Sequence, residues 1–354
     1  MHEIQEKLIK HLCLYNVLDY ESCLYLLDPY ELFTPVERSY IFRPLTRQGY
    51  LKKRQDGSVT ILAKGRSLFP DIKPLVTTGG DKQNLERVMQ VSRMAMLLAE
   101  IDVPSFGELC DFSWLHFIPS ACWRNIAPGI LSTTRFLGML IIFGGRRYAV
   151  YDIGDGHMEW QSRAEDSLFN TKHGGYETRA DGMLFVCSDE KRIEIAHHII
   201  RQTMWYRKQL LKTTHTERDK PVRWSRAPIR MKANYRHVYL TTYKTLRQSI
   251  MRIHGENTTN PLFCVGAERL TNPAQGDYEN WPYRYFCNPA CDLLKFANFF
   301  SVAKDTMQLH KSMPHIPKEP YYAVCIKPED RPILEMYSDV MNMEGLKIYE
   351  YPDR

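Results

Sequence analysis

The first seventy residues have the apolar spacing of three helices. Apolar side chains recur every three or four positions in three segments of residues 3–47, the spacing that lines one face of a helix. The second segment starts at Asp19 as a cap. The third starts at Thr34, which a proline follows, with Glu37 completing a capping box. Its pattern places the following residues toward the core: Val36, Tyr40, Ile41 and Leu45. Pro44 is expected to kink or end this helix, since it lacks an N–H donor.

A hairpin is predicted directly after the third helix. Strand-like segments over 50–54 and 59–62 flank the pair Asp56-Gly57. This pair favours a tight turn, because glycine adopts positive φ without steric cost. Residues 1–72 are therefore expected to form one small domain.

The rest of the chain alternates strand and helix patterns. An amphipathic helix over 82–100 comes first, and residues 73–102 are expected to form a linker and connecting helix. Predicted strands cover 135–143, 148–153, 157–160, 183–187, 238–240, 263–265, 322–326 and 346–351, and predicted helices begin near 82, 164, 190, 241, 292 and 329. This alternation is typical of an α/β sheet covered by helices, which we expect over 103–354.

Composition indicates a globular protein of the cytoplasm. Hydrophobic residues make up 44% and charged residues 25% of the 354 positions, and no apolar run approaches the roughly 18 residues that span a bilayer. The N-terminus lacks the basic-then-apolar layout of a secretory signal. The nine cysteines lie mostly in apolar segments, which is typical of reduced, buried thiols. Cys287 and Cys291 lack a second ligand pair for zinc, so no metal or other cofactor is expected.

The positive charge is concentrated in one segment. The formal net charge is +6, yet residues 201–252 contain fourteen Lys or Arg and only two acids. Aromatic residues are interleaved with these cations, a mixture that suits phosphate neutralisation and base stacking. The candidate nucleic-acid contacts in this basic insertion are Arg207, Lys208, Arg223, Trp224, Arg226, Arg230 and Arg236. A solvated loop or a docking surface for an acidic protein is the alternative interpretation.

The N-terminal sequence resembles a winged helix-turn-helix. The resemblance rests on the phrases LTRQGYLKK and VTILAKG on either side of the turn and covers about a fifth of the chain. It implies that the third helix enters the major groove of DNA and that the hairpin, as a wing, contacts the backbone. The implied contacts are Arg38, Ser39, Arg43 and Arg47 on the helix and Lys52, Lys53 and Arg54 on the wing.

A longer pattern is similar to the replication-relaxation family of mobile-element proteins. It joins the winged helix to the helix NLERVMQVSRMAMLLAE and to the segment beginning STTRFLGMLIIF. The resemblance implies an α/β (α+β) fold whose larger, mixed-sheet domain is a degenerate relative of the PD-(D/E)XK, restriction-endonuclease-like fold. The acids and lysine of such a site would be Asp152, Asp189 and Lys191, with Glu165 and Asp181 as further candidates.

Three functions are consistent with these observations. The first is a non-catalytic accessory protein of a plasmid or integrative element that binds DNA, or alternatively RNA, in replication, relaxosome assembly or transcription control. The second is an inhibitor or adapter of the anti-defence type, which docks on a protein of a nucleic-acid-handling complex. The third is a nuclease, for which alone Mg²⁺ is expected. No membrane partner is expected, and the oligomeric state, a dimer included, stays open.

Overall fold

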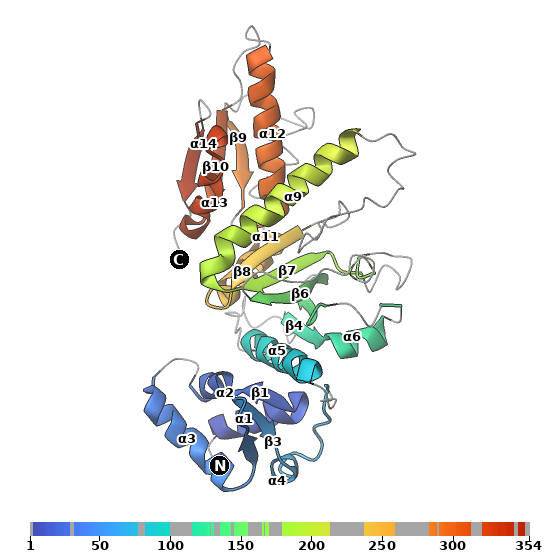
Figure 1. The fold of residues 1–354 in the computed structure, drawn as a ribbon, viewed down its shortest axis with the longest axis vertical. Helices are drawn as coiled ribbons and strands as arrows, with labels where there is room; N and C mark the ends of the chain where they lie inside the picture. Colours follow the sequence, from blue (N-terminus) through green and yellow to red (C-terminus); the bar gives the residue numbers. More distant parts are fainter. Residues whose placement is uncertain are drawn as a thin grey trace. The chain divides into compact units, whose positions relative to one another are not determined.

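The computed structural model is a mixed α/β protein (Figure 1). It describes residues 3–28, 32–76, 82–99, 115–127, 129–130, 135–142, 145–154, 165, 167–169, 179–212, 237–258, 283–288, 290–312, 321–342 and 346–350. Contacts between Cα atoms divide the chain into two compact units. Unit 1 comprises Met1–Ser132 with Phe136–Ile141 and His173–Thr178, and unit 2 comprises the remaining residues. Among the described residues, no helix is both long and apolar enough to cross a bilayer.

Unit 1 begins with helices packed on a small antiparallel sheet. Its first elements are α1 (Glu3–Tyr15), β1 (Val17–Asp19), α2 (Tyr20–Leu27), α3 (Pro35–Arg47), β2 (Leu51–Lys53), β3 (Ser58–Ile61) and α4 (Ala63–Arg66). The strand order is β1-β3-β2, with Leu18 opposite Val59 and Leu51 opposite Ile61. Leucines of α1 and α2 fill the core beneath the sheet, where Leu8, Leu12 and Leu27 are fully buried.

The predicted start and turn signals are confirmed. Asp19 caps α2 by accepting a hydrogen bond from the backbone N–H of Ser22. Thr34 and Glu37 form the capping box of α3, and Gly57 turns the hairpin with φ of +81°. The strand β1 was not predicted, because three residues are too few to show a period.

The predicted buried face of α3 is partly wrong. Val36 is 61% and Tyr40 is 59% exposed, whereas Phe42 and Leu45 are buried. The helix also continues through Pro44 to Arg47. The predicted stripe, with Val36 and Tyr40, and the observed one, with Phe42 and Leu45, both fit a helical period. Which stripe is buried therefore depends on what α3 packs against, here α2 and β2.

The helix α5 (Lys82–Ala99) belongs to unit 1. It packs on β1 and α1, where Arg93 pairs with Asp19 at 3.0 Å and the ring of His11 is hydrogen-bonded to Ser92 at 3.0 Å. Unit 1 also contains β4 (Leu115–Pro119), α6 (Ser120–Ile126) and most of β5 (Gly138–Ile142).

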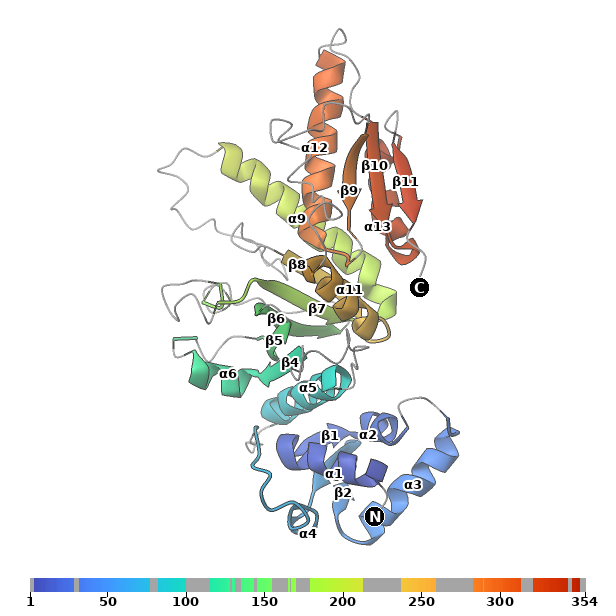
Figure 2. The same cartoon turned by 180° about the vertical axis from the view of Figure 1, so that it is seen from behind.

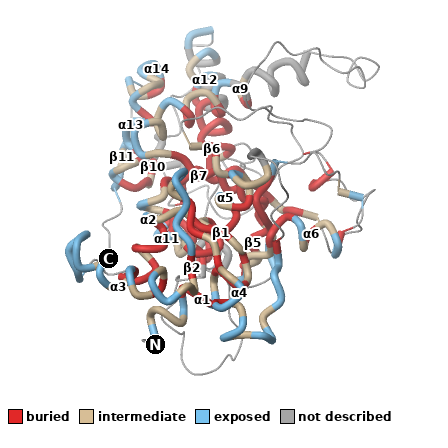
Figure 3. Tube along the Cα trace, turned by 60° about the horizontal axis from the view of Figure 1, so that its bottom comes forward, coloured by how far each residue is buried: buried red, intermediate tan, exposed pale blue. Residues whose placement is uncertain are grey.

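Unit 2 contains two groups of parallel strands. The first has β6 (Arg146–Gly154), β7 (Gly182–Cys187) and β8 (His237–Thr242) as neighbours in that order, and all six residues of β7 are buried (Figure 3). The second is a sheet of order β11-β10-β9, formed by β9 (Tyr283–Cys287), β10 (Tyr321–Ile326) and β11 (Lys347–Glu350) (Figure 2). Parallel strands buried on both faces read as continuous apolar runs, which is why the strand over 183–187 was predictable; the strand over 322–326 was predicted from a similar apolar run.

Helices connect and cover these strands. They are the 3₁₀ helix η3 (Asp189–Lys191), α9 (Arg192–Lys212), α11 (Leu246–Thr258), α12 (Leu293–Ser312), the 3₁₀ helix η6 (Pro328–Asp330), α13 (Arg331–Glu335) and α14 (Ser338–Met341). Helix α9 packs against α12 and α13, and α12 also packs against β8. The strands predicted at 157–160 and 263–265 lie outside the described residues, as does most of the helix predicted near 164.

The histidine between α1 and α5 makes the stability of unit 1 depend on pH. Burial lowers the pKa of His11 from 6.5 to about 4, although the bond to Ser92 acts in the opposite direction. The unfolded chain therefore binds a proton below pH 6.5 and the folded chain only below about pH 4. We expect the contribution of His11 to be complete above pH 6.5 and to fall by about 1–3 kcal/mol as the pH drops to about 4.

Urea unfolding of the full chain at several pH values measures this effect. The difference in the free energy of unfolding between wild type and His11→Gln should change between pH 6.5 and about pH 4 and be constant below about pH 4. A difference that is the same at pH 7.5 and pH 4.5 would contradict a buried, neutral His11.

Candidate functional site

The outward face of α3 combines aromatic and cationic side chains. Tyr40, Arg43 and Arg47 are exposed and follow one another at intervals of three and four residues, so they share a face of the helix. The guanidinium of Arg43 lies 4.6 Å from the ring centroid of Tyr40, a cation–π contact that limits its rotamers. This face therefore presents a partly ordered arginine together with an exposed aromatic ring.

Two other predicted contacts on α3 are held within the protein. Arg38 pairs with Asp28 at 3.0 Å and donates to the carbonyl of Phe33. Burial by itself raises the pKa of the Asp28 carboxyl, but hydrogen bonds from the backbone N–H groups of Phe33 and Leu32, together with Arg38, outweigh burial and lower it. Arg38 of α3 thus pairs with the residue that ends α2. The hydroxyl of Ser39 donates to the carbonyl of Val36 at 2.7 Å.

The hairpin carries exposed cations beyond the end of α3. Lys52, Lys53 and Arg54 are all exposed, and the ammonium of Lys53 lies 3.2 Å from the ring centroid of Tyr20. Since β2 is an edge strand, lysines here also protect the sheet edge from pairing with another chain. Only four residues separate Arg47 from Lys52, so the cations of α3 and of the hairpin lie on adjoining surfaces.

The basic insertion is mostly outside the described residues. Arg207 and Lys208 belong to α9, whose backbone is described there, while their side chains are not. The other predicted contacts of the insertion lie outside the described residues: Arg223, Trp224, Arg226, Arg230 and Arg236.

The predicted nuclease acids come together at one edge of a parallel sheet. Asp152 lies near the end of β6, and Asp189 comes two residues after the end of β7. The carboxyl ends of parallel strands are where α/β proteins usually place their ligand sites. Here, however, Asp152 accepts hydrogen bonds from the hydroxyl of Tyr243 and the backbone N–H of Gly154, and Asp189 pairs with Lys244 at 2.9 Å.

These contacts use part of the hydrogen-bonding capacity of the two carboxylates. The hydroxyl of Thr242 and then Lys244 lower the pKa of Asp189, so its charge is already compensated. Lys191 pairs at 2.8 Å with Glu194 on α9. Among the described residues, no group of three or more His, Cys, Asp or Glu side chains could hold a metal ion.

The two further acid candidates support the backbone. Glu165 is fully buried and accepts hydrogen bonds from the hydroxyl of Tyr151 at 2.5 Å and from the backbone N–H of Arg135. Asp181 accepts a hydrogen bond from the backbone N–H of Arg147 at 3.0 Å, at the start of β6. Both carboxylates therefore have local structural roles.

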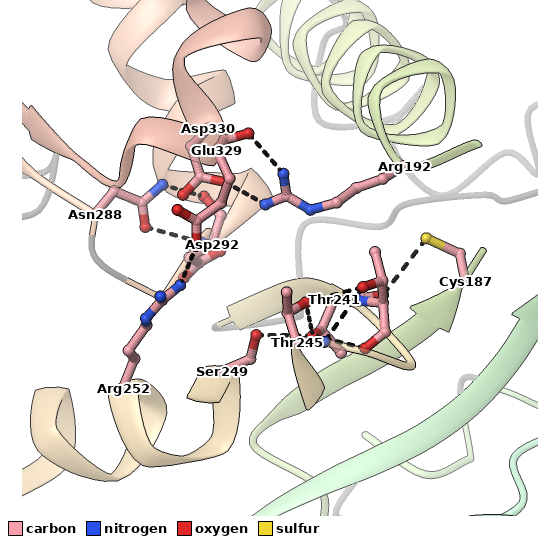
Figure 4. A network of polar contacts seen from close by, with 11 residues as sticks. Cys187, Arg192, Thr241, Thr245, Ser249, Arg252, Asn288, Asp292, Glu329 and Asp330 are labelled. Carbon is pink, nitrogen blue, oxygen red and sulfur yellow. Dashed lines mark hydrogen bonds and ion pairs between the residues drawn. The ribbon is translucent and has the colours of Figure 1, made fainter. Parts of the chain in front are cut away.

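A second polar network, which the sequence did not reveal, joins the two groups of strands in unit 2 (Figure 4). Arg192 at the start of α9 pairs with Asp330 and donates to the carbonyl of Glu329 at 2.9 Å. Arg252 of α11 pairs with the Glu329 carboxylate at 2.6 Å. Burial raises the pKa of Asp330, and Arg192 acts against this. The only sign of this network in the sequence is that Glu329 and Asp330 come shortly after an apolar strand.

Asp292 is the central acceptor of the same region. It accepts a hydrogen bond from the backbone N–H of Val238 at 3.1 Å, and its second oxygen lies 2.9 Å from the ring of His237. Asn288 donates to the carbonyl of Asp292 and accepts from its N–H. The start of β8 is therefore fixed against the turn after β9.

No family model, no curated protein and no solved structure matches this chain.

Arg38 and the exposed arginines of α3 should differ in their effect on folding. Arg38→Ala removes the cation beside the buried Asp28 carboxylate, so we expect a lower urea midpoint for unit 1. Arg43→Ala and Arg47→Ala leave the core contacts intact and should stay within about 0.5 kcal/mol of wild type. Circular dichroism during urea titration measures all three, and equal losses in the three variants would contradict the separate roles given to them.

Proposed function

We propose that residues 1–72, the first part of unit 1, form a winged helix that binds nucleic acid through α3 and the β2–β3 hairpin. The observation that carries this proposal is the exposed α3 face of Tyr40, Arg43 and Arg47, which continues into the cations of the hairpin. We propose DNA as the partner, with RNA as the alternative that the binding experiment separates.

The order and pairing of the first elements support this proposal. Helix, strand, two helices and two further strands follow one another, and the sheet order is β1-β3-β2. In a winged helix the third helix is the recognition helix and the last two strands form the wing. Here α3 is the third helix and corresponds to the recognition helix, while β2 and β3 correspond to the wing.

The chemistry of the exposed side chains also fits. The planar guanidinium of an arginine bonds two atoms of guanine or two phosphate oxygens at once. Lysines on a hairpin neutralise backbone phosphates and so position the helix without reading sequence. Tyr40 adds a large apolar ring, which suits contact with sugars or thymine methyl groups.

The remaining parts of the proposal concern activity and context. We propose that the protein is non-catalytic, which the local pairing of Asp152 and Asp189 supports. A role as an accessory protein of a mobile element, in replication, relaxosome assembly or transcription control, rests on the resemblance of the sequence.

A protein partner is a second candidate, favoured by an apolar patch at the start of α3. Leu32 is 76%, Phe33 is 39% and Val36 is 61% exposed. Clustered exposed apolar side chains mark interaction surfaces. An adapter that docks on a nucleic-acid-handling protein would use this end of α3, whereas nucleic acid would use Arg43, Arg47 and the hairpin.

Charge reversal on α3 tests the proposal. In fluorescence anisotropy with labelled duplex DNA, Arg43→Glu/Arg47→Glu should weaken binding by roughly 30-fold or more, since each contact to a base or phosphate is worth about 1–3 kcal/mol. Loss of two phosphate contacts should also reduce the slope of log affinity against log salt by about 2. Single-stranded DNA and duplex RNA, measured in parallel, identify the preferred nucleic acid.

The matched control changes the same charge elsewhere. Lys73→Glu/Lys311→Glu alters two exposed lysines outside α3 and the hairpin, and it should keep the affinity within about threefold, because it affects only the long-range field. Equal losses in both double variants would indicate non-specific attraction and contradict the α3 interface. Unchanged binding in the α3 variant, with Leu32→Asp/Val36→Asp abolishing capture of a protein partner, would favour the adapter.

A further inference from the structure

A cleft in unit 2 has features of an anion site. It has a volume of about 290 Å³ and lies between α9, α12 and the turn from α13 to α14. Its polar lining includes His197 and Arg201 of α9, Lys304 of α12, Tyr337 of the turn and Asp339 of α14. We call it the α9–α12 cleft.

Two cations from different helices converge on this cleft, and Asp339 is the one acidic residue among the described residues that line it. Arg201 and Lys304 are exposed and form no ion pair or hydrogen bond with another described residue. Elsewhere in unit 2, Arg192 and Arg252 both have acidic partners. Two like charges that face one cleft repel each other until an anion lies between them, so an anionic ligand gains from both.

The ring of Tyr337 forms a rigid wall of the cleft. It stacks on Phe300 with centroids 3.8 Å apart and an interplanar angle of 19°, and the ring of His197 meets it edge-on at 5.9 Å. The ammonium of Lys304 lies 5.6 Å from the same centroid. These contacts fix the tyrosine relative to both helices, so its polar end has a defined position.

That polar end lacks a partner. The hydroxyl of Tyr337 is buried and makes no hydrogen bond to any described residue, although a buried hydroxyl normally finds one. Burial raises the pKa of Tyr337 to about 12, with Arg201 acting in the opposite direction. The hydroxyl therefore remains protonated and is a donor next to a guanidinium, available to an anionic oxygen once the side chains that cover it move aside.

The donor set favours a phosphoryl group over a carboxylate. Arg201 can donate two parallel hydrogen bonds, and Lys304 and Tyr337 each add one from another direction. Three oxygens on one phosphorus atom match these three directions, while the two coplanar oxygens of a carboxylate match fewer. The volume of about 290 Å³ is close to the lower end of the range for ligand pockets, which begins at about 300 Å³, so the cleft suits a small ligand.

The rest of the lining indicates what the phosphoryl group is attached to. Met204 and Met336 supply polarizable apolar contact, and Asp339 with Ser338 supplies acceptors for hydroxyl or amino groups. We propose that the α9–α12 cleft binds a phosphate monoester of nucleotide size, with the phosphoryl group between Arg201 and Lys304. This site uses no residue of α3 or the hairpin, so it stands independently of the function proposed for unit 1.

Calorimetric titration of the full chain with a nucleoside 5′-monophosphate, the matching nucleoside and inorganic phosphate tests the proposal. The monophosphate should bind, and the nucleoside should bind at least about tenfold more weakly, since a charge-assisted bidentate contact is lost. Arg201→Ala and Lys304→Ala should each reduce affinity for the monophosphate about tenfold or more, and Tyr337→Phe about threefold or more. Lys311→Ala, an exposed lysine of the same helix as Lys304, is the matched control and should bind as wild type.

Each of the other possible results contradicts a specific part of the proposal. Equal affinity for the nucleoside and the monophosphate would contradict recognition of the phosphoryl group. Inorganic phosphate binding as tightly as the monophosphate would contradict recognition of the nucleoside part. Full competition by an oligonucleotide without terminal phosphates would replace the monoester with a nucleic-acid backbone. No binding by wild type, or unchanged binding in Arg201→Ala with a native circular dichroism spectrum, would overturn the site itself.

Discussion

The architecture of unit 2 depends on the buried ion pair between Arg192 and Asp330. A carboxylate removed from water is costly unless a cation and hydrogen bonds compensate it, and here the first residue of α9 provides this for one of the two oxygens. The same arginine bonds the carbonyl of Glu329, whose carboxylate in turn holds Arg252 of α11. Loss of Arg192 would therefore disturb the junction of both strand groups and also the helix pair that borders the α9–α12 cleft.

The predictability of the fold follows the range of the interactions involved. Local signals were sufficient for the caps of α2 and α3, for the turn at Gly57, and for the strands over 183–187 and 322–326. The rotation of α3 was not predictable, because its two alternative apolar stripes differ only in which neighbours they meet. The packing of α5 on the first helices was not predictable for a similar reason. Its contacts with His11 and Asp19 join residues that are more than seventy positions apart in the sequence.

The candidate sites divide in the same way. Arg43, Arg47 and the hairpin cations lie within twelve positions of one another, so sequence alone proposed them as one surface. Arg38 belongs to the same cluster in the sequence, yet only the structure shows its pairing with Asp28. The α9–α12 cleft joins residues near 200, 304 and 337, and no spacing along the chain brings them together. Of its two cations, Arg201 is the first residue of the basic segment 201–252, whereas Lys304 lies outside that segment.

Pro44 has a consequence for whatever approaches α3. Proline supplies no N–H, so the carbonyl of Tyr40, one turn earlier, loses the partner it would have in a regular helix. That carbonyl belongs to an exposed residue on the face that also carries Arg43 and Arg47. The helix therefore lacks one regular backbone hydrogen bond beside Arg43 and Arg47. We expect a carbonyl without its helical donor to favour an amino group or a water molecule over a phosphate oxygen at that point.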